Sequence, residues 1–177
     1  MSDLIKGGAF LLGPVDEKTV FIPEEFDDMH LMVKNMCLDF MENKVLAKVD
    51  EIEEKVEGVT TGLLREAGEL GLLSSDIPEE YGGEEADKIT TMLITESVNT
   101  SGSFATAFGA HTGIGTLPIV YFGNEEQKKR YLPALATGEK IAAYCLTEPE
   151  AGSDAMNSKT KAVLSEDGKY YILNGVK

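Results

Sequence analysis

The spacing of apolar residues changes near Lys140, and this change sets the fold class. Before it, apolar residues recur every three or four positions, as on one face of an α-helix. After it, two extended runs, 162–165 and 169–173, flank Glu166-Asp167-Gly168, and Asp-Gly between such runs indicates a β-hairpin. We therefore expect a mainly α protein with an arm over 1–22, a helical domain over 23–138 and the first strands of a β-domain over 139–177.

The first part of the helical region predicts two helices. A long pattern opens at Pro23 and continues through Ile52, with Gly58 as its stop. Thr61 is the expected cap of a shorter helix, which ends at Gly71.

Two further helices carry clear start signals. Asp87 is a candidate N-cap for a helix over 88–98. Asn124 and Gln127 have the spacing of a capping box for another helix, which Pro133 should break or restart.

One apolar helix, expected over 103–115, has many positions without bulk. These are Gly102, Ala105, Ala107, Gly109, Ala110, Gly113 and Gly115. Such positions allow either close packing of another helix or the wall of a ligand pocket, and on the letters alone both readings stand.

Charge and hydropathy exclude some partners. The chain has 16 Lys and Arg against 31 Asp and Glu, a formal net charge of -15, whereas nucleic acids and anionic membranes require a positive surface. The apolar run Ala9 to Leu12 is too short for a membrane span or a signal peptide. We expect a cytoplasmic protein.

The histidines and cysteines indicate structural positions. His111 is expected as a buried, hydrogen-bonded core residue and His30 as a half-exposed helix residue. Cys37 and Cys145 lie in apolar runs and are expected to be reduced and buried. Neither metal ligation nor a Ser-His-Asp site is indicated.

The segment from Tyr144 to Asp154 is the best candidate for a binding site. Residues 140–146 are apolar enough for a strand, and Pro149 and Gly152 then prevent a helix. Gly152 lets a ligand approach the backbone, and the hydroxyls of Thr147 and Ser153 offer donors and acceptors to a flat, anionic cofactor. Without further context, a strand exit with an internally satisfied polar turn is the simpler interpretation.

Three motifs resemble the acyl-CoA dehydrogenase flavoprotein family, in particular its long-chain and very-long-chain branch. They are Ile77-Pro78-Glu79-Glu80-Tyr81-Gly82-Gly83, Gly123-Asn124-Glu125-Glu126-Gln127-Lys128-Lys129-Arg130-Tyr131-Leu132-Pro133, and Thr147-Glu148-Pro149 followed after two residues by Gly152-Ser153-Asp154. The segment from Tyr170 to Lys177 resembles the same family. The resemblance begins near Pro23 and covers most of the chain. Asn157 departs from it, because the family usually has a small residue there.

The resemblance implies FAD as cofactor and oxidation of an acyl-CoA, with a long chain, to trans-2-enoyl-CoA in fatty acid β-oxidation. It implies electron-transfer flavoprotein as the electron acceptor and a homo-oligomer as the assembled state. Residues implied at the cofactor are Tyr144, Leu146, Thr147, Gly152 and Ser153. Residues implied at the substrate are Ser153, Gly102, Ala105 and Gly109.

The resemblance also implies that this chain is an N-terminal fragment, without the family's catalytic glutamate, and we expect it to be inactive alone. Asn174-Gly175 signals a second turn with only two residues after it. Glu148 and Asp154 are as readily explained as turn-stabilising carboxylates as by ligand contacts. An acyl-CoA oxidase and a non-catalytic helical interaction module remain alternatives.

Overall fold

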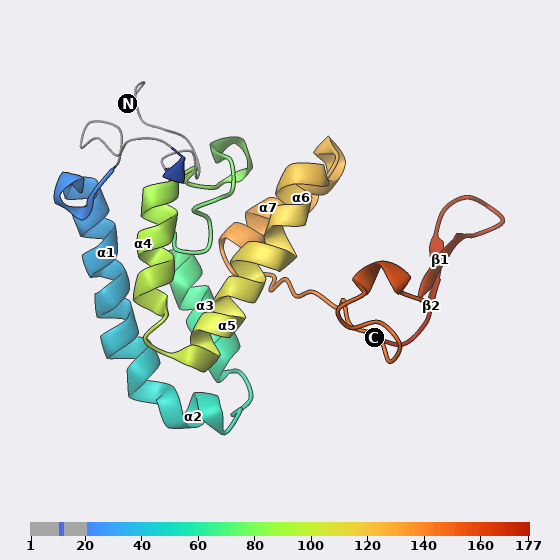
Figure 1. The fold of residues 1–177 in the computed structure, drawn as a ribbon, viewed down its shortest axis with the longest axis horizontal. Coiled ribbons are helices and arrows are strands. Elements are labelled where there is room, and N and C mark those ends of the chain that lie inside the picture. Colours follow the sequence, from blue (N-terminus) through green and yellow to red (C-terminus); the bar gives the residue numbers. More distant parts are fainter. Residues whose placement is uncertain (1–10, 13–20) are drawn as a thin grey trace.

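The computed structural model describes residues 11–12 and 21–177, so most of the arm expected over 1–22 lies outside the described residues. Helices gather into one body, from which the chain leaves as an extended segment that ends in a hairpin (Figure 1). The mainly α fold with the first strands of a sheet, predicted from the sequence, is confirmed.

The helical body contains short turns between its longer helices. The α-helices are α1 Asp28–Phe40, α2 Val49–Glu53, α3 Val59–Glu69, α4 Lys88–Val98, α5 Gly102–Gly109, α6 Leu117–Phe122 and α7 Glu125–Ala136. The 3₁₀ turns of this body are η2 Pro23–Glu25, η4 Leu46–Lys48 and η5 Glu79–Tyr81, and its π-helical segments are η3 Met41–Val45 and η6 Ala110–Thr116. A further 3₁₀ turn, η7 Ala155–Asn157, lies between the extended segment and the hairpin.

The first long helix begins later than predicted. Pro23 starts only the 3₁₀ turn η2, and α1 starts at Asp28 because the Asp27 side chain accepts the His30 amide at 2.8 Å. The helical path then continues through η3 and η4 into α2, which ends at Glu53, before Gly58. Its buried side chains form one core cluster with α3, α4 and α5.

The expected cap at Thr61 is wrong. Gly58, with a φ of +84°, precedes the first residue of α3, and Thr61 lies inside the helix, where its hydroxyl donates to the Gly58 carbonyl at 3.2 Å. The end of the helix near Gly71 is confirmed, and the φ of Gly71 is +76°.

Both polar start signals are confirmed. The Asp87 side chain accepts the Ile89 and Thr90 amides at 2.8 and 2.9 Å and starts α4 at Lys88. Asn124 and Gln127 bond reciprocally at 2.9 Å and start α7. The break expected at Pro133 is wrong.

Helix α7 continues through Pro133 to Ala136. The proline removes one helical hydrogen bond, but Leu132, Leu135 and Ala136 around it are buried against Ile77 and Tyr81, and this packing supports the helix.

The chain after α7 is extended but unpaired, so the strand predicted over 140–146 is wrong. A strand needs a partner, and within the described residues none pairs with this segment. The hairpin is confirmed: β1 Lys161–Leu164 pairs antiparallel with β2 Tyr171–Asn174, and Gly168 in the turn has a φ of +69°. The chain bends at Gly175, and the turn signalled by Asn174-Gly175 stays a prediction.

Candidate functional site

The segment over 143–147 presents its backbone to solvent. All five residues are exposed, and the Tyr144 side chain is 52% exposed. In the described part of the chain, their amides make no hydrogen bond. A row of unpaired donors on an extended chain is suited to acceptors on the edge of a flat ligand.

A tight turn follows this row. The amide of Glu148 donates to the Ala151 carbonyl at 3.0 Å, and the Ala151 amide donates back at 3.1 Å. Both residues are buried, in contrast to Pro149 and Glu150 between them. The turn over 148–151 is therefore stabilised by hydrogen bonds between its own backbone groups.

The carboxylate of Glu148 accepts three donors. They are the amides of Lys159 and Thr160 and the ammonium of Lys177, which is 3.0 Å from Oε1. Thr160 has the largest effect on the carboxyl, followed by the Lys159 amide, and together with Lys177 they outweigh burial and lower the pKa of Glu148 to about 2. Glu148 is thus a structural carboxylate. The structure assigns no such bond to the Asp154 side chain among the described residues.

Gly152 and Ser153 lie beyond this turn and are exposed. A Cβ on Gly152 would meet no atom within 4 Å, and Gly152 does not have a positive φ. Neither packing nor backbone conformation within the described chain requires glycine there, so an open approach to the backbone is the property that Gly152 provides.

The helix predicted over 103–115, which we call the small-residue helix, is formed by α5 and η6. Its glycines differ in which of the two interpretations, close packing or an open wall, applies to them. A Cβ on Gly102, Gly109 or Gly113 would meet nothing within 4 Å, whereas one on Gly115 would lie 2.6 Å from the Ala142 Cβ. Close packing therefore explains Gly115, and an open face explains the other three. Ala105 on the same helix is half-buried.

His111 joins this helix to the segment that carries the candidate site. Its ring is fully buried, Nδ1 accepts the Ala142 amide at 3.0 Å and Nε2 donates to the Leu135 carbonyl at 3.0 Å. Burial lowers the pKa of His111, although the Leu135 carbonyl partly opposes this. The predicted core role of His111 is confirmed.

His30 is not half-exposed as predicted. It is 6% exposed, and the rings of Phe21 and Phe26 lie beside it. Its Nδ1 accepts the Asp27 amide, and Nε2 lies 3.3 Å from Asp87 Oδ2 on α4. Burial raises the pKa of Asp87, but the amides of Thr90 and Ile89 and the His30 ring lower it by more. Sequence reasoning missed this link because it joins residues 57 positions apart.

The two cysteines differ from each other. Cys37 is fully buried as predicted, and burial raises its pKa to about 11. Cys145 is exposed, so its predicted burial is wrong; it lies in the extended segment, which pairs with none of the residues that the structure describes.

The candidate residues fall into two groups. Tyr144, Leu146, Thr147, Gly152 and Ser153 lie on one continuous stretch, whereas Gly102, Ala105 and Gly109 lie on α5 in the helical body (Figure 1). The close contact of Gly115 with Ala142 connects the end of the small-residue helix to the start of the stretch.

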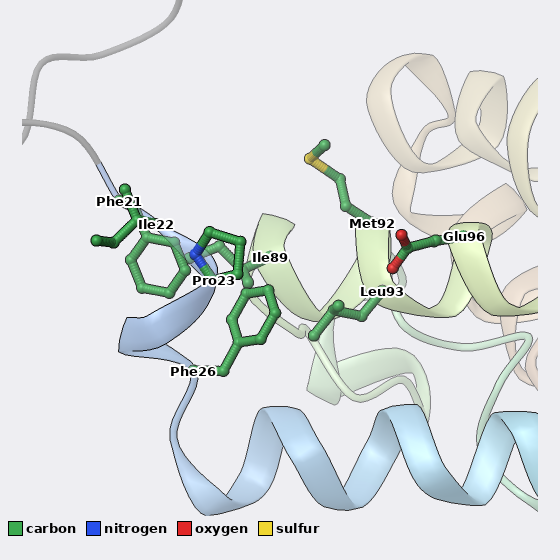
Figure 2. A pocket seen from close by; sticks show the side chains of 8 residues that line it. All are labelled: Phe21, Ile22, Pro23, Phe26, Ile89, Met92, Leu93 and Glu96. Atoms are coloured by element: carbon green, nitrogen blue, oxygen red, sulfur yellow. The ribbon is translucent and has the colours of Figure 1, made fainter.

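An apolar pocket of about 490 Å³ lies elsewhere, between α4 and the segment that precedes α1 (Figure 2). It is lined by Phe21, Ile22, Pro23, Phe26, Ile89, Met92, Leu93 and Glu96. Glu96 pairs with Lys34 at 3.6 Å, so its charge already has a partner. Sequence reasoning missed this pocket, although Phe21, Ile22 and Phe26 are an apolar signal.

None of the helices in the described part of the chain combines the length and apolarity that crossing a membrane requires. Over the same residues, His, Cys, Asp and Glu side chains form no group of three or more that could hold a metal ion.

Comparison with known proteins identifies the family. Residues 27–139 match the family model described as acyl-CoA dehydrogenase, N-terminal domain. A probable acyl-CoA dehydrogenase of Bacillus subtilis is 53% identical over 99% of this chain and 30% of its own length. The human very long-chain specific acyl-CoA dehydrogenase, mitochondrial, is 40% identical over 92% of this chain and 23% of its own length.

A solved structure agrees with this assignment. The acyl-CoA dehydrogenase of Bacillus anthracis, complexed with FAD, matches with a TM-score of 0.92 and 53% identity, over 97% of this chain and 29% of that one. The chain belongs to the acyl-CoA dehydrogenase family, and it spans less than a third of the length of these relatives.

Proposed function

We propose that this chain forms the N-terminal part of an FAD-dependent acyl-CoA dehydrogenase, with residues 23–138 as its helical domain and 139–177 as the beginning of its β-domain. The observation that carries the proposal is the row of exposed, unpaired amides over 143–147. The Bacillus anthracis relative, which holds FAD, supports the choice of flavin as the ligand.

The residues of this chain fit such a cofactor. The amides near Leu146 and Thr147, with the Thr147 hydroxyl, would donate to acceptors on the isoalloxazine edge. The open backbone at Gly152 and the Ser153 hydroxyl would meet the cofactor and the CoA arm. Bound FAD would supply the chemistry by accepting a hydride from the β-carbon of the acyl group.

The substrate proposal is an acyl-CoA with a long chain, oxidised to trans-2-enoyl-CoA in fatty acid β-oxidation. The open face at Gly102 and Gly109, next to the half-buried Ala105, would leave depth for the acyl chain. The very-long-chain relative is consistent with this choice. The assembled enzyme would be a homo-oligomer and would pass electrons to an electron-transfer flavoprotein.

The experiment is to purify the whole protein that carries this chain and add acyl-CoA substrates without oxygen. We expect a yellow protein whose flavin absorbance falls on addition of a saturated acyl-CoA, most rapidly with long chains. The 177-residue chain alone serves as control, since we expect no turnover from it. A whole protein that binds no flavin would contradict the proposal, and electron transfer to oxygen without an added acceptor would identify an oxidase instead.

A further inference from the structure

Glu148 is buried in a stretch whose preceding residues are exposed. Its side chain is 2% exposed, whereas residues 143–147 are all exposed. A buried carboxylate is costly unless donors surround it, and the amides of Lys159 and Thr160 and the ammonium of Lys177 do so here. These contacts thus hold the Glu148 carboxylate in place directly after the exposed row over 143–147.

Lys177 connects this carboxylate to the backbone of the candidate site. Its Nζ lies 3.0 Å from Glu148 Oε1 and 2.9 Å from the Leu146 carbonyl oxygen, which is 31 positions away in sequence. The ion pair therefore fixes the direction in which the Leu146 carbonyl points.

The direction of that carbonyl determines the direction of the next amide. The Leu146 carbonyl and the Thr147 N–H belong to one planar peptide unit, and no described peptide bond is cis. In a trans unit the two groups point in opposite directions. The Thr147 N–H consequently points away from Lys177, and it makes no hydrogen bond to the described residues.

We propose that Glu148 and Lys177 are positioning residues, which aim the Thr147 amide at the flavin edge by holding the Leu146 carbonyl on the opposite side. This inference rests on the proposed function, because it needs the flavin as the acceptor. Neither Glu148 nor Lys177 has to touch the cofactor.

Gly175 supports the same arrangement. A Cβ on Gly175 would lie 2.1 Å from Thr160 Oγ1 and 2.7 Å from the Thr160 Cα, so the end of the chain passes directly over Thr160. Only glycine allows this approach without displacing backbone, and the approach brings Lys177 to Glu148. Gly175→Ala should therefore act like a loss of Lys177.

The first test uses amide hydrogen exchange on the 177-residue chain. Glu148→Gln should accelerate exchange of the Lys159 and Thr160 amides about tenfold, because a charged acceptor becomes neutral. Lys177→Met should accelerate them less. Glu150→Gln, which changes an exposed carboxylate in the same turn, should leave both rates unchanged, and so should Lys169→Met on the hairpin. Unchanged exchange in Glu148→Gln would overturn the proposal.

The second test measures flavin in the whole protein. Glu148→Gln and Lys177→Met should weaken FAD binding about tenfold, as expected for one misdirected hydrogen bond, and alter the visible circular dichroism of the bound flavin. Lys177→Arg should restore both, and far-ultraviolet circular dichroism checks that each variant is folded.

The outcomes separate this proposal from the proposed function. Folded variants with faster exchange and an unchanged flavin spectrum and affinity would show a purely structural role and overturn the positioning role alone. A wild-type protein that takes up no flavin would overturn the proposed function, and the positioning role with it.

Discussion

Replacing His111 with Leu should destabilise the protein by about 2 to 5 kcal/mol. The side chain is fully buried and satisfies two backbone groups, the Leu135 carbonyl on α7 and the Ala142 amide. Leucine fills part of the space but bonds to neither group. Each group left unpaired costs about 1 to 3 kcal/mol, and the Ala142 amide, being only partly buried, costs less than the Leu135 carbonyl.

Two conservative variants divide this loss between the two bonds. The side-chain oxygen of His111→Asn can take the place of Nδ1 and keep the Ala142 amide paired. The side-chain nitrogen of His111→Gln can take the place of Nε2 and keep the Leu135 carbonyl paired. Each variant should recover about half of the loss, with more recovered when the buried Leu135 carbonyl remains paired.

Urea denaturation followed by far-ultraviolet circular dichroism measures these changes. Exchange of the Ala142 amide should also accelerate in His111→Leu, because that amide loses its acceptor. A loss of less than about 1 kcal/mol in His111→Leu would refute the reasoning, because it would mean that neither backbone group depends on the imidazole.

Three further predictions follow from the same contacts. Because the folded pKa of His111 is lowered, the free energy of unfolding should be highest above the unfolded pKa near 6.5 and should fall as the pH decreases below it. The pKa of Glu148 is lowered to about 2, so its contribution to stability should begin to fall only below pH 4.5. Urea midpoints across pH, with His111→Gln as reference, distinguish the two contributions. Gly115→Ala should cost about 1 to 3 kcal/mol through its clash with Ala142, whereas Gly113→Ala should be neutral or stabilise by up to about 1 kcal/mol; equal thermal midpoints for the pair would contradict this. Asp87→Ala should cost about 1 to 2 kcal/mol in thermal unfolding through loss of the α4 cap, and Asp87→Asn, which can still cap, should retain most of that stability.

Local signals in the sequence predicted the parts of the fold that depend on neighbouring residues. Asp87 caps α4 through amides two and three positions away, and Asn124 and Gln127 bond across three positions. The Asp167-Gly168 hairpin likewise depends on its own turn. These interactions need only neighbouring residues, so the sequence pattern was sufficient to predict them.

The wrong cap at Thr61 is a local error, but the other errors concern interactions between distant residues. His30 contacts Asp87, which is 57 positions away, and no local pattern marks that contact. Helix α7 continues through Pro133 because a separate core cluster supports it. Whether residues 140–146 form a strand depends on a pairing partner, and the described residues offer none.

In the candidate site too, the local motif was predictable from the sequence and the long-range contact was not. The motif from Thr147 to Asp154 indicated a cofactor loop by resemblance, and it placed the open glycine and the hydroxyls on one stretch. The role of Lys177 was not predictable, because its ammonium meets Glu148 and Leu146 only after the hairpin has folded back. The assignment of individual cofactor and substrate residues stays a prediction.

The central claim is that the backbone over 143–147 lies along a flavin. Amide hydrogen exchange of these residues in the whole protein, with and without FAD, tests it most directly. The account predicts that FAD slows exchange of the Leu146 and Thr147 amides at least about tenfold, as expected for donors that gain an acceptor. Saturating FAD that leaves the exchange of both amides unchanged would contradict it.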